Sequence, residues 1–461
     1  MNSPVVEPME TVSTIVRSHL PDMAYYQDLY QWFHSHPELS RSEKKTGEKI
    51  AEELKGLPGF EIRTNVGGHG VVGVLKNDTG KVVLLRAETD ALPILEETGL
   101  SYASTVRAID VVDGIAKPVM HACGHDLHMV SLLAAARLLH ASKHLWRGTL
   151  VALFQPDEES GAGAQAMFED GLFDPLRHDV PTPDVALGGH IMPLKTGLVK
   201  TRPGVICGAA DTYSVTLYGR GGHGSRPHTA VDPVVMASSL VLKLQTIVSR
   251  EIDPRETAVL TVGSIHAGAA ANVISNQAKL QVNIRAFNPT IQSRLLEAMT
   301  RMIKAECLAF GAPKEPLLEH TGSFPLLHND EASTDKVAKA FKKHFGANFD
   351  MDAAISTGSE DFANLTLPLS IPTVFWNYGG IDSNVWDTAA AHGRLMEIPG
   401  THLASILRHV TKVCYRESQF RICACNAAHP LDCSRGLCDR SPHFSGRLMI
   451  AYFGEGTPLL N

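Results

Sequence analysis

The sequence predicts an α/β protein, in which a mostly parallel-sheet catalytic domain with helices on both faces is interrupted by a smaller α+β sandwich. Over the first half of the chain, short apolar runs alternate with helical patterns, which is typical of βαβ units. From about Asp211 apolar and polar residues alternate instead, and the first pattern returns past Phe324. We therefore expect a catalytic domain over 1–208 and 321–411, an inserted lid and dimerisation domain over 209–320, and an atypical cysteine-rich tail over 412–461.

The first part of the chain begins with two predicted helices. Tyr26, Leu29, Tyr30 and Phe33 are spaced to share one helical face, and the break at His36-Pro37-Glu38 separates this helix from a second one over 42–54. Further along, we expect strands at 70–75, 82–85, 149–154 and 185–187, and helices at 129–140 and 163–169.

The segment that follows Asp211 predicts a sandwich with its helices on one side. Its expected elements are a half-buried strand from Tyr213, a helix over 234–249, strands at 258–265 and 280–284, and a helix over 292–310, in the order βαββα. In residues 279–285 the polar side chains alternate with apolar ones, so Arg285 lies on a face that is free to look across a cleft. A helix over 334–345 and an apolar run at 371–376 then resume the first pattern.

Composition excludes several classes of function. The chain has 461 residues, 44% hydrophobic and 20% charged, with a net charge of -7, so nucleic acid is not an expected partner. No apolar stretch reaches the roughly 18 residues needed to span a bilayer, and Met1 to Glu10 lack the features of a signal peptide. We expect a cytoplasmic protein without a membrane partner. Cys123, Cys207 and Cys307 lie far apart, so the main body has no disulfide framework.

The motif Met120-His121-Ala122-Cys123-Gly124-His125-Asp126, followed later by Glu158-Glu159, predicts a metal site. Residues i and i+2 of an extended segment point to the same face, so Cys123 and His125 can share one coordination site. Thiolate, imidazole and carboxylate ligands together suit zinc, and manganese less well. Taken singly, each residue has an ordinary structural explanation, because buried cysteines and solvated glutamates are common.

Polar side chains follow three of the predicted strands. Arg86 to Asp90 come after 82–85, Glu158-Glu159 come after 149–154, and His190 comes after 185–187. In open α/β sheets ligands bind at the carboxyl ends of the strands. One site at this edge could therefore collect all three groups.

Seven segments together resemble the motifs of one known family. They are Arg86 to Pro93, Met120 to Asp126, Phe154 to Glu159, His190 to Pro193, Gly221 to His228, Asn272, and Gly358 to Phe362. The chain resembles the dinuclear metal amidohydrolases of the aminoacylase and carboxypeptidase family, in the branch that holds hippurate hydrolase and indoleacetyl-amino-acid hydrolase. The likeness runs in unbroken order from Tyr26 to His402.

The resemblance implies a role for each site residue. The ligands of two divalent metal ions would be Cys123, His125, Glu159, His190 and His402. Glu158 would be the general base, and Asp90 would orient a ligating histidine. Adjacent residues of a loop project differently, so Glu159 can bind metal while Glu158 faces the attacking water.

In the smaller domain the resemblance assigns substrate contacts to His223, Asn272 and Arg285, and Gly358 joins them from the later motif. Arg285 would bind a free α-carboxylate through two hydrogen bonds. His223 would reach the cleft of a partner subunit and steady the oxyanion, which implies a homodimer.

The chain departs from the family pattern at two places. Glu88 stands where relatives carry Asp, which adds a methylene group in a tight shell. After His402 the expected Ser-Pro-aromatic continuation is missing, and Ser441-Pro442-His443-Phe444 resembles it. We interpret 403–440 as an insertion, with translated non-coding sequence as one origin. A metal site built from the late cysteines is an alternative, and His392 competes with His402 for the ligand role.

These patterns predict metal-dependent hydrolysis of the amide bond of N-acyl or N-aroyl amino acids by a metal-activated water, with Glu158 as general base. A dipeptidase or carboxypeptidase is the nearest alternative, and it would need a group that binds a free α-amine. No acidic group for that purpose is evident in the motifs. A second alternative is an inactive relative that binds carboxylated metabolites.

Overall fold

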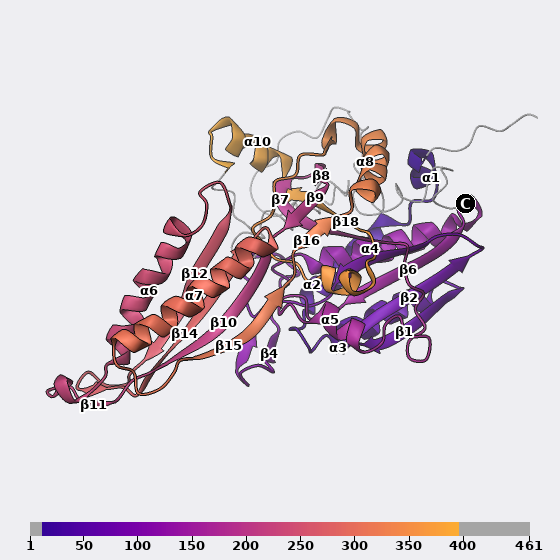
Figure 1. Ribbon diagram of the computed structural model, residues 1–461. Helices are drawn as coiled ribbons and strands as arrows, with labels where there is room; N and C mark the ends of the chain where they lie inside the picture. The colour runs from indigo at the N-terminus through magenta and orange to yellow at the C-terminus, as the bar shows by residue number, and fades with distance from the viewer. Residues whose placement is uncertain (1–11, 396–461) are drawn as a thin grey trace, which may run out of the picture.

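The computed structural model describes residues 12–395, in which the largest sheet has eight strands (Figure 1). In spatial order these are β1 (Phe60–Val66), β2 (Gly70–Asn77), β6 (Gly148–Gln155), β3 (Val82–Glu88), β7 (Val185–Lys195), β18 (Thr373–Ile381), β8 (Val199–Thr201) and β17 (Phe349–Asp350). The central strands β6, β3, β7 and β18 are mutually parallel, whereas β1, β2 and β8 pair antiparallel. The sheet is therefore mostly parallel, as predicted.

Helices cover both faces of this sheet. One face packs against α2 (Met23–Ser35), α3 (Lys44–Lys55), α4 (His125–Ala141) and α8 (Glu331–Phe345), and the other against α5 (Gly163–Glu169) and α9 (Ala363–Thr366). Within β3, Val83 and Leu85 join the first hydrophobic cluster and Leu84 joins the second. A fully buried side chain of this size contributes roughly 1.5–3 kcal/mol, so burial on both faces fixes β3 at the centre of the sheet.

Strand β7 is longer than the sequence predicts. The apolar run ends at Leu187, but the strand continues to Lys195, and His190 lies inside it opposite Asn377 of β18. The two glycines that follow the run leave room for aromatic rings. A Cβ atom at Gly188 would lie 3.0 Å from the Phe375 ring, and one at Gly189 would lie 2.3 Å from Trp376. The expectation that His190 follows the strand was wrong for this reason. Strand β3 likewise includes Arg86 and Glu88, which were expected past its end.

A second sheet has four antiparallel strands. In spatial order they are β12 (Ala258–Ala267), β14 (Gln277–Ala286), β10 (Ala209–Tyr218) and β15 (Leu317–Phe324). Its one apolar face packs against α6 (Pro233–Arg250) and α7 (Pro289–Ala309), which lie side by side in Figure 1. Asp232 and Asn288 cap these helices through their side chains, and a proline follows each cap. The edge strand β15 was not predicted, because most of its side chains are exposed and it carries no apolar alternation.

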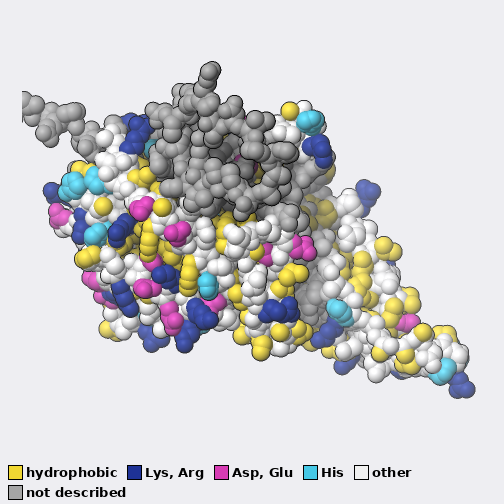
Figure 2. All heavy atoms as spheres, turned by 180° about the vertical axis from the view of Figure 1, so that it is seen from behind, with side chains coloured by type: hydrophobic (Ala, Val, Ile, Leu, Met, Phe, Trp, Pro, Cys, Tyr) yellow, Lys and Arg dark blue, Asp and Glu magenta, His cyan; other side chains and the backbone are white. Residues whose placement is uncertain are grey.

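The remaining strands and α-helices are short. They are α1 (Val12–Ser18), β4 (Arg107–Ile109) paired with β5 (Ala116–Pro118), β9 (Gly204–Cys207) paired with β16 (Leu327–Asn329), β11 (Gly222–His223) paired with β13 (Val273–Ile274), and α10 (Ser383–Ala391). Within residues 12–395, every helix is too short or too polar to cross a bilayer. On the face shown in Figure 2, basic and acidic side chains are interspersed on the larger body of the molecule.

The two sheets meet close to the end of β6. Gly161 adopts a φ of 72°, and a Cβ atom there would lie 2.9 Å from the carbonyl oxygen of Ser323, the next-to-last residue of β15. Arg285 of β14 also donates to the Thr357 carbonyl oxygen at 2.7 Å. The loop that carries Glu158 and Glu159 is thus in contact with the smaller sheet.

Candidate metal centre

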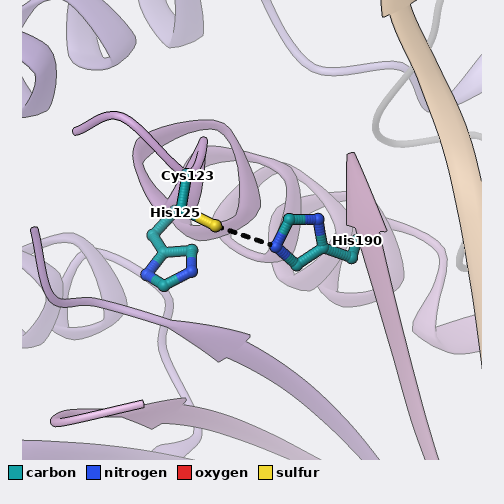
Figure 3. Close-up of side chains that lie close together, drawn as sticks. All are labelled: Cys123, His125 and His190. Carbon is teal, nitrogen blue, oxygen red and sulfur yellow. Dashed lines mark hydrogen bonds between the residues drawn. The ribbon is translucent and has the colours of Figure 1, made fainter. Parts of the chain in front are cut away.

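Three ligand-type side chains from separate elements converge at the carboxyl end of the large sheet. Cys123 precedes α4, His125 is its first residue, and His190 comes from β7 (Figure 3). One ligand atom from each lies within 4.8 Å of the others, and Cys123 Sγ lies 3.3 Å from His190 Nε2. All three side chains are buried or half-buried. The structure therefore brings these three predicted ligands together.

The backbone that joins Cys123 to His125 is not extended, contrary to the geometry assumed from the sequence. Gly124 has a φ of 84°, in the left-handed region that favours glycine, and α4 begins directly after it. A Cβ atom at Gly124 would lie 2.5 Å from Ile191 Cγ2, so the turn also packs against β7. The two side chains meet because the chain turns sharply here.

Asp90 holds the ring of His125 in place. His125 Nδ1 lies 2.9 Å from the carbonyl oxygen of Asp90 and 3.2 Å from its Oδ1. Asp90 is itself fixed, since Oδ2 accepts from Ser40 Oγ at 2.7 Å and from the Glu159 amide at 3.0 Å. The other ring nitrogen, His125 Nε2, is buried and has no hydrogen-bond partner among the described residues. A proton on Nδ1 thus leaves the lone pair of Nε2 directed into the site, as a metal ligand requires.

Glu158 and Glu159 form a second ligand-type group with His125. Glu158 Oε2 lies 4.0 Å from His125 Nε2. The preceding residue, Asp157, has a φ of 54°, which is uncommon for a residue other than glycine, and Arg41 stabilises it through a hydrogen bond to Oδ2 at 2.9 Å. This turn presents the two carboxylates where β6 ends.

The charges of the site favour a bound cation. Burial raises the pKa of the Cys123 thiol and of Glu158, and the neighbouring carboxylates raise both further. Burial also raises the pKa of Glu159 to about 7, although His125 lowers it. A divalent cation would stabilise the thiolate and both carboxylates in their charged forms. The donor set of sulfur, imidazole and carboxylate fits zinc, so these residues can hold a metal ion.

His128 and Glu88 also lie in the centre, and the sequence assigned neither a role. Glu88 Oε2 accepts from His128 Nδ1 at 2.7 Å, and both side chains are buried. His128 is three residues past His125 and therefore lies on the same side of α4. That spacing was the available signal for His128.

Arg86 forms ion pairs with other acidic side chains of the centre. It donates to Glu88, to Glu360 at 2.8 Å and to Asp361 at 2.9 Å. Glu158, Glu360 and Asp361 have carboxylate oxygens within 4.8 Å of one another. The resemblance marked Glu360 and Asp361 only as motif residues, and the structure places them beside the predicted general base.

The predicted substrate residues fall into two places. Arg285 donates to Thr357 O and, at 3.2 Å, to Ser359 Oγ, so it flanks Gly358. His223 is exposed on β11 beside Asn272, whose carbonyl oxygen accepts from the Gly224 amide at 2.8 Å. Figure 1 shows β11 at the far end of the smaller sheet, away from α4 and β7. One chain therefore does not bring His223 to the metal centre.

His402, the fifth predicted ligand, and the late cysteines lie outside the described residues. The competing residue His392 follows α10, is exposed, and lies with Nδ1 2.7 Å from the Thr388 carbonyl oxygen.

The model of Peptidase family M20/M25/M40 matches residues 84–399, which include every predicted metal ligand except His402. The chain belongs to this family. The resemblance inferred from the motifs is thus confirmed, and the protein is a hydrolase of a family that acts on amide or peptide bonds.

Two relatives and one solved structure show the range of similar M20 proteins. N-acetyl-L-cysteine deacetylase of Bacillus subtilis is 37% identical over 332 residues, which cover 72% of this chain and 74% of that protein. Hippurate hydrolase of Campylobacter jejuni is 36% identical over 340 residues, covering 73% of this chain and 84% of that protein. A dinuclear metal binding peptidase of the M20 family from Bacillus subtilis has a TM-score of 0.62 at 26% identity and covers 81% of this chain and 98% of its own.

Proposed function

We propose that this protein hydrolyses the amide bond of N-acyl or N-aroyl amino acids and releases a carboxylic acid and an amino acid. The observation that carries the proposal is the position of Glu158, a buried carboxylate 4.0 Å from the ligand-type nitrogen of His125 and next to Glu159 in the chain. The names of the relatives, a deacetylase and a hippurate hydrolase, agree with this substrate class.

The proposed ligands of two divalent metal ions are Cys123, His125, Glu159, His190 and His402. Zinc is the expected metal and manganese the alternative. Bound divalent ions supply polarisation of the amide carbonyl and activation of water at neutral pH.

Glu158 supplies the proton transfer. Its carboxylate would accept a proton from the attacking water and pass it to the leaving amine. Burial raises the pKa of Glu158, and Glu360 and Glu159 raise it further, which makes the carboxylate a stronger base than a solvated glutamate. Arg86, which donates to Glu88, lowers the pKa of Glu158 and so limits this increase.

Arg285 supplies recognition of the amino-acid carboxylate. Its described hydrogen bonds use Nε, to Asn283, and Nη1, to Thr357 and Ser359, and among residues 12–395 none uses Nη2. The loop it holds runs directly into Glu360, which lies in the same cluster as Glu158. A carboxylate bound at Nη2 would place the scissile amide of a small substrate toward the base, whereas a longer peptide would have to extend past this loop.

A hydrolysis panel tests the proposal. Purified protein loaded with zinc or manganese would be given N-acetyl, N-benzoyl and indoleacetyl amino acids beside dipeptides, with and without a chelator. We expect chelator-sensitive release of amino acid from the acylated substrates. Faster cleavage of dipeptides would identify an exopeptidase instead, and metal-loaded protein that cleaves none of them would support an inactive binding protein.

The position of His223 supports a homodimer as part of the proposal. The side chain is exposed at the far end of the smaller sheet, so a second copy could place it over the metal centre of the first (Figure 1). A mixture of His223→Ala and Glu158→Gln chains tests this arrangement. A mixed dimer contains one site with both residues intact, so we expect activity well above that of either variant alone. A mixture no more active than its components would rule out the exchange.

A further inference from the structure

We infer that Glu88 and His128 are positioning residues for the metal ligand His190, an assignment that rests on the proposed metal-dependent function. Their described hydrogen bonds join them to Arg86, to each other and to Ile191, and none goes to Glu158 or Arg285. Both belong to a continuous line of hydrogen bonds, buried except for the last, that ends on the ring of His190.

The line begins at Arg86, whose guanidinium donates to one oxygen of Glu88. The other oxygen of Glu88 accepts from His128 Nδ1 at 2.7 Å. His128 Nε2 in turn accepts from the Ile191 amide at 3.0 Å. The carbonyl oxygen of Ile191 accepts from His190 Nδ1. The peptide unit on each side of Ile191 is thus held, one by His128 and one by His190.

These contacts determine which nitrogen of each ring carries the proton. Because a carboxylate only accepts, His128 Nδ1 must donate to Glu88, and its unprotonated Nε2 can then accept from Ile191. The same reasoning gives His190 a proton on Nδ1, which leaves the lone pair of Nε2 toward Cys123 Sγ, 3.3 Å away. Fixing the tautomer and ring direction of a ligating histidine is the established effect of such outer partners.

Packing supports the hydrogen bonds. The His128 and His190 rings meet edge to face with centroids 4.7 Å apart. Because both nitrogens of His128 already have partners, the ring does not offer a ligand atom of its own, although it lies close enough to His125 and Glu88 to do so. His128 therefore supports a ligand instead of acting as one.

The Glu88 side chain is long enough to join two elements at this position of the Arg86 to Pro93 motif. Its two oxygens reach partners on different elements, Arg86 on β3 and His128 on α4. A glutamine of the same size could keep the hydrogen bond from Arg86, but its amide group would face His128 Nδ1. His128 would then carry its proton on Nε2, opposite the donor of Ile191, so one contact must break.

Zinc affinity, measured by competition with a chromophoric chelator in the absence of substrate, tests the inference. We expect Glu88→Gln and His128→Phe to weaken zinc binding by about 10- to 100-fold. His128→Gln, whose amide oxygen can still accept from Ile191, should recover part of the loss. The matched control is His178→Gln, which removes a histidine held by Asp170 at 2.9 Å in the turn between α5 and β7, and it should bind zinc as the wild type does.

The spectrum of the cobalt(II)-loaded protein provides a second measurement. Absorption that arises from the Cys123 thiolate and His190 on cobalt should change in Glu88→Gln and His128→Phe and remain unchanged in His178→Gln. Wild-type zinc affinity and an unaltered cobalt spectrum in Glu88→Gln, which conserves side-chain size, would overturn the inference even if His128→Phe does not fold. A wild-type protein that binds zinc but cleaves no acylated amino acid would contradict the proposed function alone, because these measurements need no substrate.

Discussion

Replacement of Arg86 by methionine should destabilise the protein strongly, since one buried cation holds several acidic groups. The guanidinium has no solvent exposure and donates to Gln155 at 2.9 Å, to Glu88, to Glu360 at 2.8 Å and to Asp361 at 2.9 Å. Methionine fills a similar length but leaves the three carboxylates without their cation. Removing one partner of a buried ion pair costs about 3–5 kcal/mol.

This free energy converts into a measurable shift. With a urea dependence of about 3 kcal/mol per molar, the unfolding midpoint should fall by roughly 1 to 1.7 M. Unfolding of the metal-free protein would be followed by circular dichroism and tryptophan fluorescence. The control is Arg147→Met, because Arg147 is 71% exposed and its ion pair with Asp78 should contribute less than about 1 kcal/mol.

The destabilisation by Arg86→Met should depend on pH in a defined direction. Burial raises the pKa of Asp361 to about 7, and Glu360 also raises it while Arg86 lowers it. The native state therefore binds this proton more tightly than the unfolded state, and Asp361 reduces stability as pH rises from its ordinary pKa of 3.8 toward 7. Without Arg86 the reduction is larger, so the destabilisation by Arg86→Met should grow between pH 5 and pH 8. A loss below about 1 kcal/mol, or one that shrinks over this range, would refute the reasoning.

Three other changes separate the roles assigned to single residues. Glu158→Gln should keep its metal and lose turnover by a factor on the order of 10² or more, measured with elemental analysis of the same sample; equal loss of metal would identify Glu158 as a ligand. Arg285→Lys should raise KM for an N-acyl amino acid about tenfold with less effect on kcat, and an unchanged KM would remove Arg285 from carboxylate binding. His34→Gln should destabilise most at low pH: burial lowers the pKa of His34, but hydrogen bonds to Asp126 and Glu96 outweigh it and raise the pKa to about 9. The stabilisation by protonated His34 is complete below its ordinary pKa of 6.5 and is lost as pH rises through 9. Urea titrations in which the destabilisation by His34→Gln grows with pH would contradict this role of His34.

Most of the secondary structure could be predicted because it depends on local periodicity. The helix over 163–169 was predicted with the bounds that α5 has, and the alternation in 279–285 matches the buried and exposed residues of β14. Strand β15 could not be predicted, since an edge strand with mostly exposed side chains has no apolar period. The extension of β7 through Gly188 and Gly189 depends on aromatic rings of β18, which lie far along the chain.

The sequence by itself determined which residue types are present for metal and proton chemistry: Cys123, His125, His190 and the Glu158-Glu159 pair, in an order that matches the M20 family. Tertiary structure decided which of them share a site and how each is held. The turn at Gly124 packs against Ile191 of β7, and the support of His125 by Asp90 and the line from Arg86 through Glu88 and His128 to His190 join residues far apart in the chain. Contacts between residues far apart in the chain produce no local periodicity in the sequence, because the residues between the two partners can have any pattern that is compatible with folding.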